Sequence, residues 1–242
     1  MPSSTYSRDE VVAEVTSYYD FIASVYLPTS VIKRPPPGGW SDITPEFLAP
    51  LNKNKNLLDL IRHLPFVVRD EHDEPYQIFE GTSAVDFTGE YIKKSFCSSH
   101  PNVDIAEPPK DWGKLPPHVL ALATPAEGRN GLYFFIDTER GVAIVCDCQE
   151  GPRSTKLSKK QESDDDEWRA HATYTVKDFF TSLKEQFRSF KVIATSERVV
   201  EKAGGSDYNP DKRRKEIYEE HRVFTDRYDK VACLERIKEV EP

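Results

Sequence analysis

Two apolar runs joined by a short turn constrain the fold of this chain more than any other feature. The runs "GLYFFIDT" (131–138) and "GVAIVCDC" (141–148) are rich in β-branched and aromatic residues, and the run "HVLALAT" (118–124) precedes them. Gly141 lies in the short connection and can adopt the positive φ that closes a β-hairpin. Because both runs are apolar at nearly every position, we expect this sheet to be covered on both faces.

Helices are predicted before and after this sheet. The opening helix has Ser7 as its N-cap and Glu10 three residues later, which is the spacing of a capping box. A helix after the sheet is capped by Thr175 and carries Phe179 and Leu183 on its apolar stripe. Further helices are predicted at 44–51, at 55–64 before Pro65, from Pro210 and over 229–240, and short strands at 76–79 and 84–87.

The order of these elements predicts an α+β fold. We expect a central, mostly antiparallel sheet with helices packed on it, and extra N-terminal and C-terminal helices. The proline-rich stretch "KRPPPGGWSD" and the glycine pair at 204–205 mark breaks in the chain. We therefore divide the chain into an N-terminal helix with its Pro-rich connection (1–39), an α+β core domain (40–200) and a C-terminal helical extension (201–242).

Composition narrows the classes of partner. The net charge of −8 disfavours nucleic acid and anionic membrane, because both require a basic surface. The chain has no apolar leader and no apolar run of about 18 residues, so neither secretion nor membrane spanning is expected. The 4 cysteines are too scattered for a disulfide framework, which predicts a cytoplasmic protein. Phosphate-binding loops, dinucleotide fingerprints and common hydrolase motifs are absent from the sequence, so no cofactor is expected.

The stretch "NLLDLIRHLPFVVRDEHDEP" (56–75) holds the strongest candidate for catalysis. Asp59 and His63 are four residues apart on the predicted helix and share a face, so the aspartate can orient the histidine as a general base. Asp70, in the acidic segment that follows, is the third candidate. The structural alternative is a histidine in the last helical turn that favours the helix dipole, followed by a solvated loop.

Two further groups of residues have both a chemical and a structural interpretation. Cys146 and Cys148 point the same way on a strand and resemble half of a zinc site. The second ligand pair is missing, so buried apolar thiols are the expected outcome and no metal site is predicted. Asp137 and Glu139 flank the hairpin turn and are candidate binding residues, although carboxylates at hairpin tips are usually solvated.

The loop tryptophans are candidate contact residues for a protein partner. Trp40 follows "PPPGG" and Trp112 follows "PPKD", so both lie in connections rather than in regular elements. Such rings either cover an edge of the core or anchor a binding surface. The acidic segment 163–167 is expected to form a charged rim beside them.

Parts of the chain resemble a set of uncharacterised filamentous-fungal proteins. The resemblance is carried by "GGWSDITPEFLAPLNKNKNLLDLIRHLPFV", "YQIFEGTSAVDFTG" and "IDTERGVAIVCDCQEGP". In those proteins a tryptophan and an "LLRHLPY"-type helix end precede a similar hairpin. The resemblance brings no known activity.

A looser pattern is similar to the SUKH superfamily, which includes fungal cell-wall synthesis regulators and bacterial toxin-immunity proteins. The matching positions are Gly131, Tyr133, Phe135, Asp137, Gly141, Val142, Phe179, Phe180 and Leu183. This resemblance implies an α+β fold with one bent antiparallel sheet, and a protein that binds other proteins. The long insertion at 98–117 departs from the pattern, and no catalytic residue can be carried over.

Two functions of different classes follow from these observations. The leading hypothesis is a non-enzymatic intracellular protein-binding or regulatory module that contacts its partner through Trp40, Trp112, Asp137 and Glu139. The alternative is an enzyme acting on a small molecule, with Asp59, His63 and Asp70 as an acid–base group. Self-association through the C-terminal helices, giving a homo-oligomer, is a third possibility.

Overall fold

The computed structural model describes residues 5–69, 74–108, 115–127, 131–147, 172–204 and 210–240. Its centre is a six-stranded antiparallel sheet with the strand order β3-β4-β5-β6-β7-β8. The strands are β3 (Gln77–Phe79), β4 (Thr82–Ala84), β5 (Val119–Pro125), β6 (Leu132–Asp137), β7 (Val142–Asp147) and β8 (Ala172–Thr175). The predicted α+β class and antiparallel sheet are confirmed.

The β6–β7 hairpin is buried on both faces, as its apolar sequence predicts. Phe134 pairs with Val145 across the hairpin, and Gly141 closes the turn with a φ of 63°. Phe134 belongs to the main hydrophobic core, whereas Phe135 belongs to a smaller cluster on the opposite face. Because successive strand residues point to opposite faces, one hairpin supplies side chains to both clusters.

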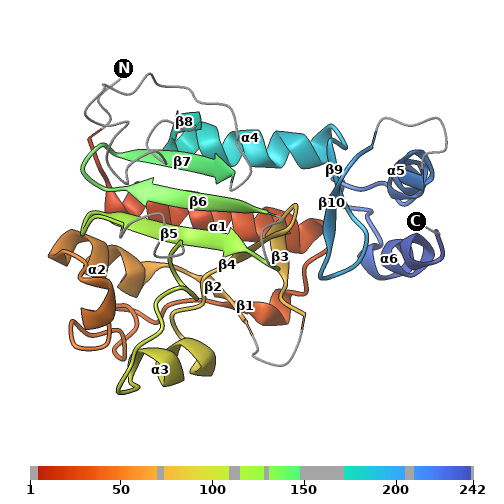
Figure 1. Cartoon of the computed structure of the whole chain (residues 1–242). Helices are drawn as coiled ribbons and strands as arrows, with labels where there is room; N and C mark the ends of the chain where they lie inside the picture. The colour runs from red at the N-terminus through yellow and green to blue at the C-terminus, as the bar shows by residue number, and fades with distance from the viewer. Residues whose placement is uncertain are drawn as a thin grey trace.

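Two long helices pack together on the main-core side of the sheet. They are α1 (Arg8–Val25) and α4 (Val176–Arg188). Figure 1 shows α1 crossing behind the central strands and α4 running beside β7 and β8. The predicted N-caps are confirmed: the Ser7 hydroxyl oxygen accepts from the Glu10 N–H, and the Thr175 hydroxyl oxygen accepts from the Asp178 N–H.

Helix α1 is also tied to the β3 edge of the sheet. The Tyr18 hydroxyl donates to the Ile78 carbonyl, and the Tyr26 hydroxyl donates to the Gln77 carbonyl at 2.8 Å. Both tyrosine rings are fully buried. The N-terminal helix therefore contributes directly to the core that covers the sheet.

The segments between α1 and β3 and between β4 and β5 are built from short elements. They are η1 (Thr29–Val31), β1 (Ile32–Lys33), η2 (Ala49–Leu51), α2 (Lys55–His63), β2 (Phe66–Val67) and α3 (Glu90–Phe96). The predicted helix at 44–51 is wrong, because Pro50 cannot donate to a helical ladder and only turns and η2 form. The strand expected at 84–87 ends at Ala84, since the Asp86 carboxylate accepts from the Thr88 N–H and turns the chain.

The C-terminal part adds a hairpin and two helices. These are β9 (Val192–Ala194), β10 (Val200–Lys202), α5 (Pro210–Glu220) and α6 (Lys230–Lys238). The two helices were expected, but β8, β9 and β10 were not. The Tyr218 hydroxyl donates to the Ala194 carbonyl and the Tyr228 hydroxyl to the Val25 carbonyl, so α5 and the loop after it are fastened to β9 and α1.

A buried ion pair fixes the long connection between α3 and β5. Lys53 and Glu107 are in direct contact, and their side chains are 1% and 6% exposed. Burial lowers the pKa of Lys53, and the Glu107 carboxylate opposes that shift. The Lys53 ammonium also lies 3.5 Å from the Pro116 carbonyl oxygen, just before β5.

Breaking this pair from one side should be worse than removing it entirely. We expect Glu107→Leu to lower the free energy of unfolding by about 3–5 kcal/mol, because it leaves an ammonium buried without its counter-charge. The double variant Lys53→Met/Glu107→Leu should recover much of that loss. Urea unfolding of both single variants and the double variant measures the coupling, and strictly additive effects would contradict this account.

Candidate functional site

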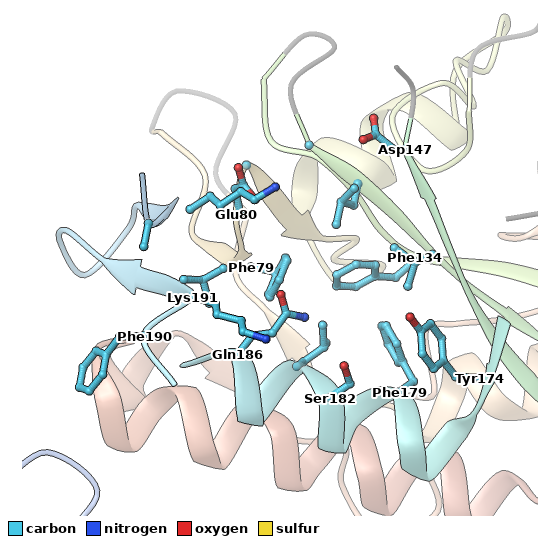
Figure 2. Close-up of a pocket in the computed structure, with 18 residues that line it drawn as sticks. Phe79, Glu80, Phe134, Asp147, Tyr174, Phe179, Ser182, Gln186, Phe190 and Lys191 are labelled. Atoms are coloured by element: carbon cyan, nitrogen blue, oxygen red, sulfur yellow. The ribbon is translucent and has the colours of Figure 1, made fainter. Parts of the chain in front are cut away.

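A cleft of about 720 Å³ opens between helix α4 and the sheet. Its walls come from α4, from strands β6 and β7, from the β3–β4 turn and from the β9–β10 region, as Figure 2 shows. Segments that are more than 100 residues apart in sequence therefore meet here. The volume falls within the roughly 300–1,000 Å³ that is typical of ligand-binding pockets.

Aromatic rings form the inner wall of the cleft. The Phe134 and Phe179 ring centroids are 5.0 Å apart with the rings nearly perpendicular, and Phe79 lies 6.0 Å from Phe134. Tyr174, on β8, extends this wall at 6.2 Å from Phe179. Because these phenylalanines are also buried members of the main core, the wall is rigid and already formed.

Neutral polar groups line the α4 side. Ser182 and Gln186 are one helical turn apart and flank the apolar stripe that contains Leu183. Figure 2 shows both side chains rising from α4 toward the sheet. A hydroxyl and a carboxamide in this position can donate to and accept from the polar groups of a bound molecule.

Charged groups of both signs surround the opening. Glu80 and Asp147 are half-buried in the sheet side, whereas Lys191 and Lys202 are exposed on the β9–β10 side. Burial raises the pKa of the Glu80 carboxyl; the Lys202 ammonium opposes this shift and the Asp147 carboxylate adds to it. A carboxylate in such a place is less well stabilised than one in open water.

Two glycines allow the β3–β4 turn and the start of β6 to approach each other closely. Gly131 and Gly81 both have positive φ, and a Cβ on Gly131 would lie only 2.1 Å from the Gly81 carbonyl oxygen. The same carbonyl accepts from the Ala126 N–H at 2.7 Å. The glycines therefore hold Glu80 and Leu132 at the cleft, and no other residue type fits at Gly131.

The lining combines apolar walls with a few polar and charged side chains. Among the described residues that line the cleft there is neither histidine nor cysteine, so Ser182 has no adjacent imidazole to activate it. Apolar walls with a few polar groups at the rim are typical of sites that hold a ligand by shape and burial.

The predicted catalytic pair lies away from this cleft, at the end of α2. His63 Nδ1 is 2.7 Å from the Asp59 carbonyl oxygen and 3.4 Å from Asp59 Oδ1. The second oxygen of Asp59 is paired with Arg8 at 3.0 Å. These contacts are those of a histidine that closes a helix end, and its use in catalysis stays a prediction. Asp70 lies outside the described residues.

Trp40 packs against the same helix end. Its indole N–H donates to the Leu64 carbonyl at 2.9 Å, and its ring lies 6.0 Å from Phe66. The half-buried ring therefore covers an edge of the core. Of the two roles considered for a loop tryptophan, core cover and anchoring of a binding surface, this is the first. Trp112 and the acidic segment 163–167 lie outside the described residues, so the proposed contact surface stays a prediction.

The hairpin carboxylates have different surroundings. Asp137 is buried, and its Oδ1 accepts from the N–H groups of Glu139 and Arg140, each at 3.0 Å. Glu139 is exposed and lies 3.3 Å from His118 Nδ1. Asp137 thus shapes the turn, whereas Glu139 remains accessible to a partner.

The described residues contain neither a candidate metal centre nor a candidate membrane span. Cys146 is buried, as expected for an apolar thiol, and Cys148 lies outside the described residues. Within the part of the chain that the structure describes, no three His, Cys, Asp or Glu side chains are grouped to hold a metal ion. No helix within these same ranges has the length and apolar character needed to cross a bilayer.

Comparisons with protein-family models, with curated proteins and with solved structures found no match. The resemblances to the fungal set and to the SUKH superfamily therefore stay predictions.

The cleft has no counterpart among the sites that the sequence predicts. The sequence pattern places Phe179 and Leu183 on the apolar stripe of a helix and does not distinguish Asp147. Glu80, Gln186 and the β9–β10 lysines had no pattern that distinguishes them from surface residues. The available signal was the pair of turn glycines in "EGTS" and "NGLY", which indicates a close backbone approach.

The loop that carries Trp40 offers a matched test of close packing. Gly38 and Gly39 have φ of 88° and 83°, but a Cβ on Gly39 would lie 2.6 Å from the Arg62 carbonyl oxygen, whereas one on Gly38 meets nothing within 4 Å. We expect Gly38→Ala to cost about 1 kcal/mol of stability and Gly39→Ala roughly 2–4 kcal/mol. Equal losses in urea unfolding would show that the contact with Arg62 is unimportant.

Proposed function

We propose that this chain is a non-enzymatic binding module whose cleft, between α4 and the sheet, receives a segment of a partner protein. The observation that carries the proposal is the aromatic wall of the cleft, made by Phe79, Phe134 and Phe179. Burying an apolar side chain of a partner against such a wall contributes about 1.5–3 kcal/mol to binding. Because the rings are held by the core, little ordering is needed when the partner binds.

The polar lining supports a polypeptide as the ligand. Ser182 and Gln186 offer a hydroxyl and a carboxamide along one side of the cleft. Peptide groups carry both donors and acceptors, so an extended segment can be matched by neutral groups of this kind. The resemblance to the SUKH superfamily, whose members mostly bind other proteins, points in the same direction.

The setting that we propose is the cytoplasm. Support comes from Cys97, which is an exposed free thiol. An exposed free thiol is expected where the surroundings are reducing. The net charge of −8 supports a protein partner over nucleic acid.

Filling the cleft should abolish binding without unfolding the protein. We expect Ser182→Trp to prevent recovery of the partners that the wild type enriches from lysate, because the new ring occupies the space against Phe179. Quantitative mass spectrometry of affinity-purified material, with circular dichroism as a check on folding, makes the measurement.

The neighbouring exposed position provides the control. Thr181 is exposed on the same helix and does not line the cleft. Thr181→Trp adds the same ring to the same helix and should leave the partners unchanged. If Ser182→Trp recovers the same partners as the wild type, the cleft is not the binding site.

A further inference from the structure

The charged groups at the cleft differ in how far they are removed from water. Glu80 and Asp147 are half-buried, whereas Lys191 and Lys202 are exposed. An exposed ammonium is already well solvated. Pairing it with an anion of a ligand therefore contributes little to the binding free energy, just as exposed ion pairs contribute little to stability. A partly desolvated carboxylate gains more, because the local dielectric is lower and less water competes.

Glu80 is a half-buried carboxylate whose charge is not paired within the described part of the protein. Within the described residues, its carboxylate has neither an ion pair at 4.0 Å or less nor a hydrogen bond. The Lys202 ammonium is close enough to act on its titration but does not pair with it. By contrast, other buried charges have partners: Lys53 with Glu107, Arg214 with Glu201 and Asp211, and Asp86 with Lys33.

We propose that the cleft selects a partner segment in which a lysine or arginine adjoins an apolar residue, with Glu80 receiving the cation. This inference rests on the proposed function. The apolar side chain packs on the ring of Phe134 and its neighbours, and the cation lies at the opening. Figure 2 places Glu80 and Asp147 on the sheet side of the same space, so a second carboxylate adds its field to the first.

The chemistry of the lysine and arginine side chains suits this geometry. Both carry an aliphatic stem that can lie along the apolar wall while the charged end reaches the rim. A guanidinium can also donate two parallel hydrogen bonds to one carboxylate. An acidic segment would instead place its carboxylate beside Glu80 and Asp147, where repulsion opposes binding.

Binding of such a segment should weaken as the pH falls. The Glu80 carboxyl has a raised pKa, so it becomes protonated at a higher pH than an ordinary glutamate and then ceases to attract a cation. The other charged or titratable groups facing it are Asp147, Lys202, Lys191 and Tyr174. Replacing Glu80 by glutamine should remove its contribution to this pH dependence.

Three capped dipeptides test the charge preference directly. They are acetyl-Phe-Arg-amide, acetyl-Phe-Gln-amide and acetyl-Phe-Glu-amide, which share the aromatic ring and lack terminal charges. Titrations followed through the backbone amide resonances of Leu132, Ser182 and Gln186 give dissociation constants at the cleft. We expect the Arg peptide to bind about tenfold more tightly than the Gln peptide, and the Glu peptide to bind most weakly.

Two glutamate variants distinguish a local effect from a general one. Glu80→Gln should reduce the preference for the Arg peptide over the Gln peptide to about twofold or less, since the nearly isosteric amide removes only the charge. Glu235→Gln removes an exposed carboxylate on α6 that does not line the cleft and should preserve the preference. Loss of the preference in both variants would reveal a non-specific effect of net charge and overturn the proposal.

The outcomes separate this inference from the proposed function. Equal binding of the Arg and Gln peptides would overturn the cation preference while leaving an apolar binding cleft intact. Failure of all three peptides to shift the cleft resonances would also overturn it. The binding function itself is judged separately, by whether Ser182→Trp loses the partners that Thr181→Trp retains.

Discussion

The fold depends on burying both faces of the β6–β7 hairpin. Neither strand can turn a polar face to water, so each face must be covered by other parts of the chain. On one side α1 and α4 supply the cover, and their own contact through Tyr18 and Phe180, with ring centroids 5.6 Å apart, joins the two helices into one layer.

The cleft is an extension of this core. Phe79, Phe134 and Phe179 are nearly inaccessible, yet each contributes to the wall that a ligand would touch. A binding surface made from core side chains is rigid, because changing its shape would require repacking the core. The position of Phe79 is set by α1, whose tyrosines bond to the carbonyls of β3. Helix α1 thereby influences the cleft although none of its residues lines it.

The electrostatics of the cleft depend on local desolvation more than on the net charge of the protein. The protein has a net negative charge, but water and dissolved salt screen the interactions of charges on an exposed surface. At the cleft the relevant quantity is the local desolvation of Glu80, which raises its pKa even though a lysine lies nearby. A half-buried carboxylate without a partner costs stability in the free protein, and a bound cation would offset that cost.

Interactions between residues close in sequence determined several helix ends and the turn of the β6–β7 hairpin. The N-caps at Ser7 and Thr175, the hairpin at Gly141 and the end of α2 before Pro65 follow from side chains within a few residues, so the sequence alone predicts them. The failures at 44–51 and 84–87 also have local causes, in Pro50 and in the side-chain bond of Asp86. The three-residue strands β9 and β10 and the cleft are different, because they arise where distant segments meet. Only the tertiary structure decided that Glu80, Asp147 and Gln186 face one space, since their burial and neighbours depend on packing between segments that share no local pattern.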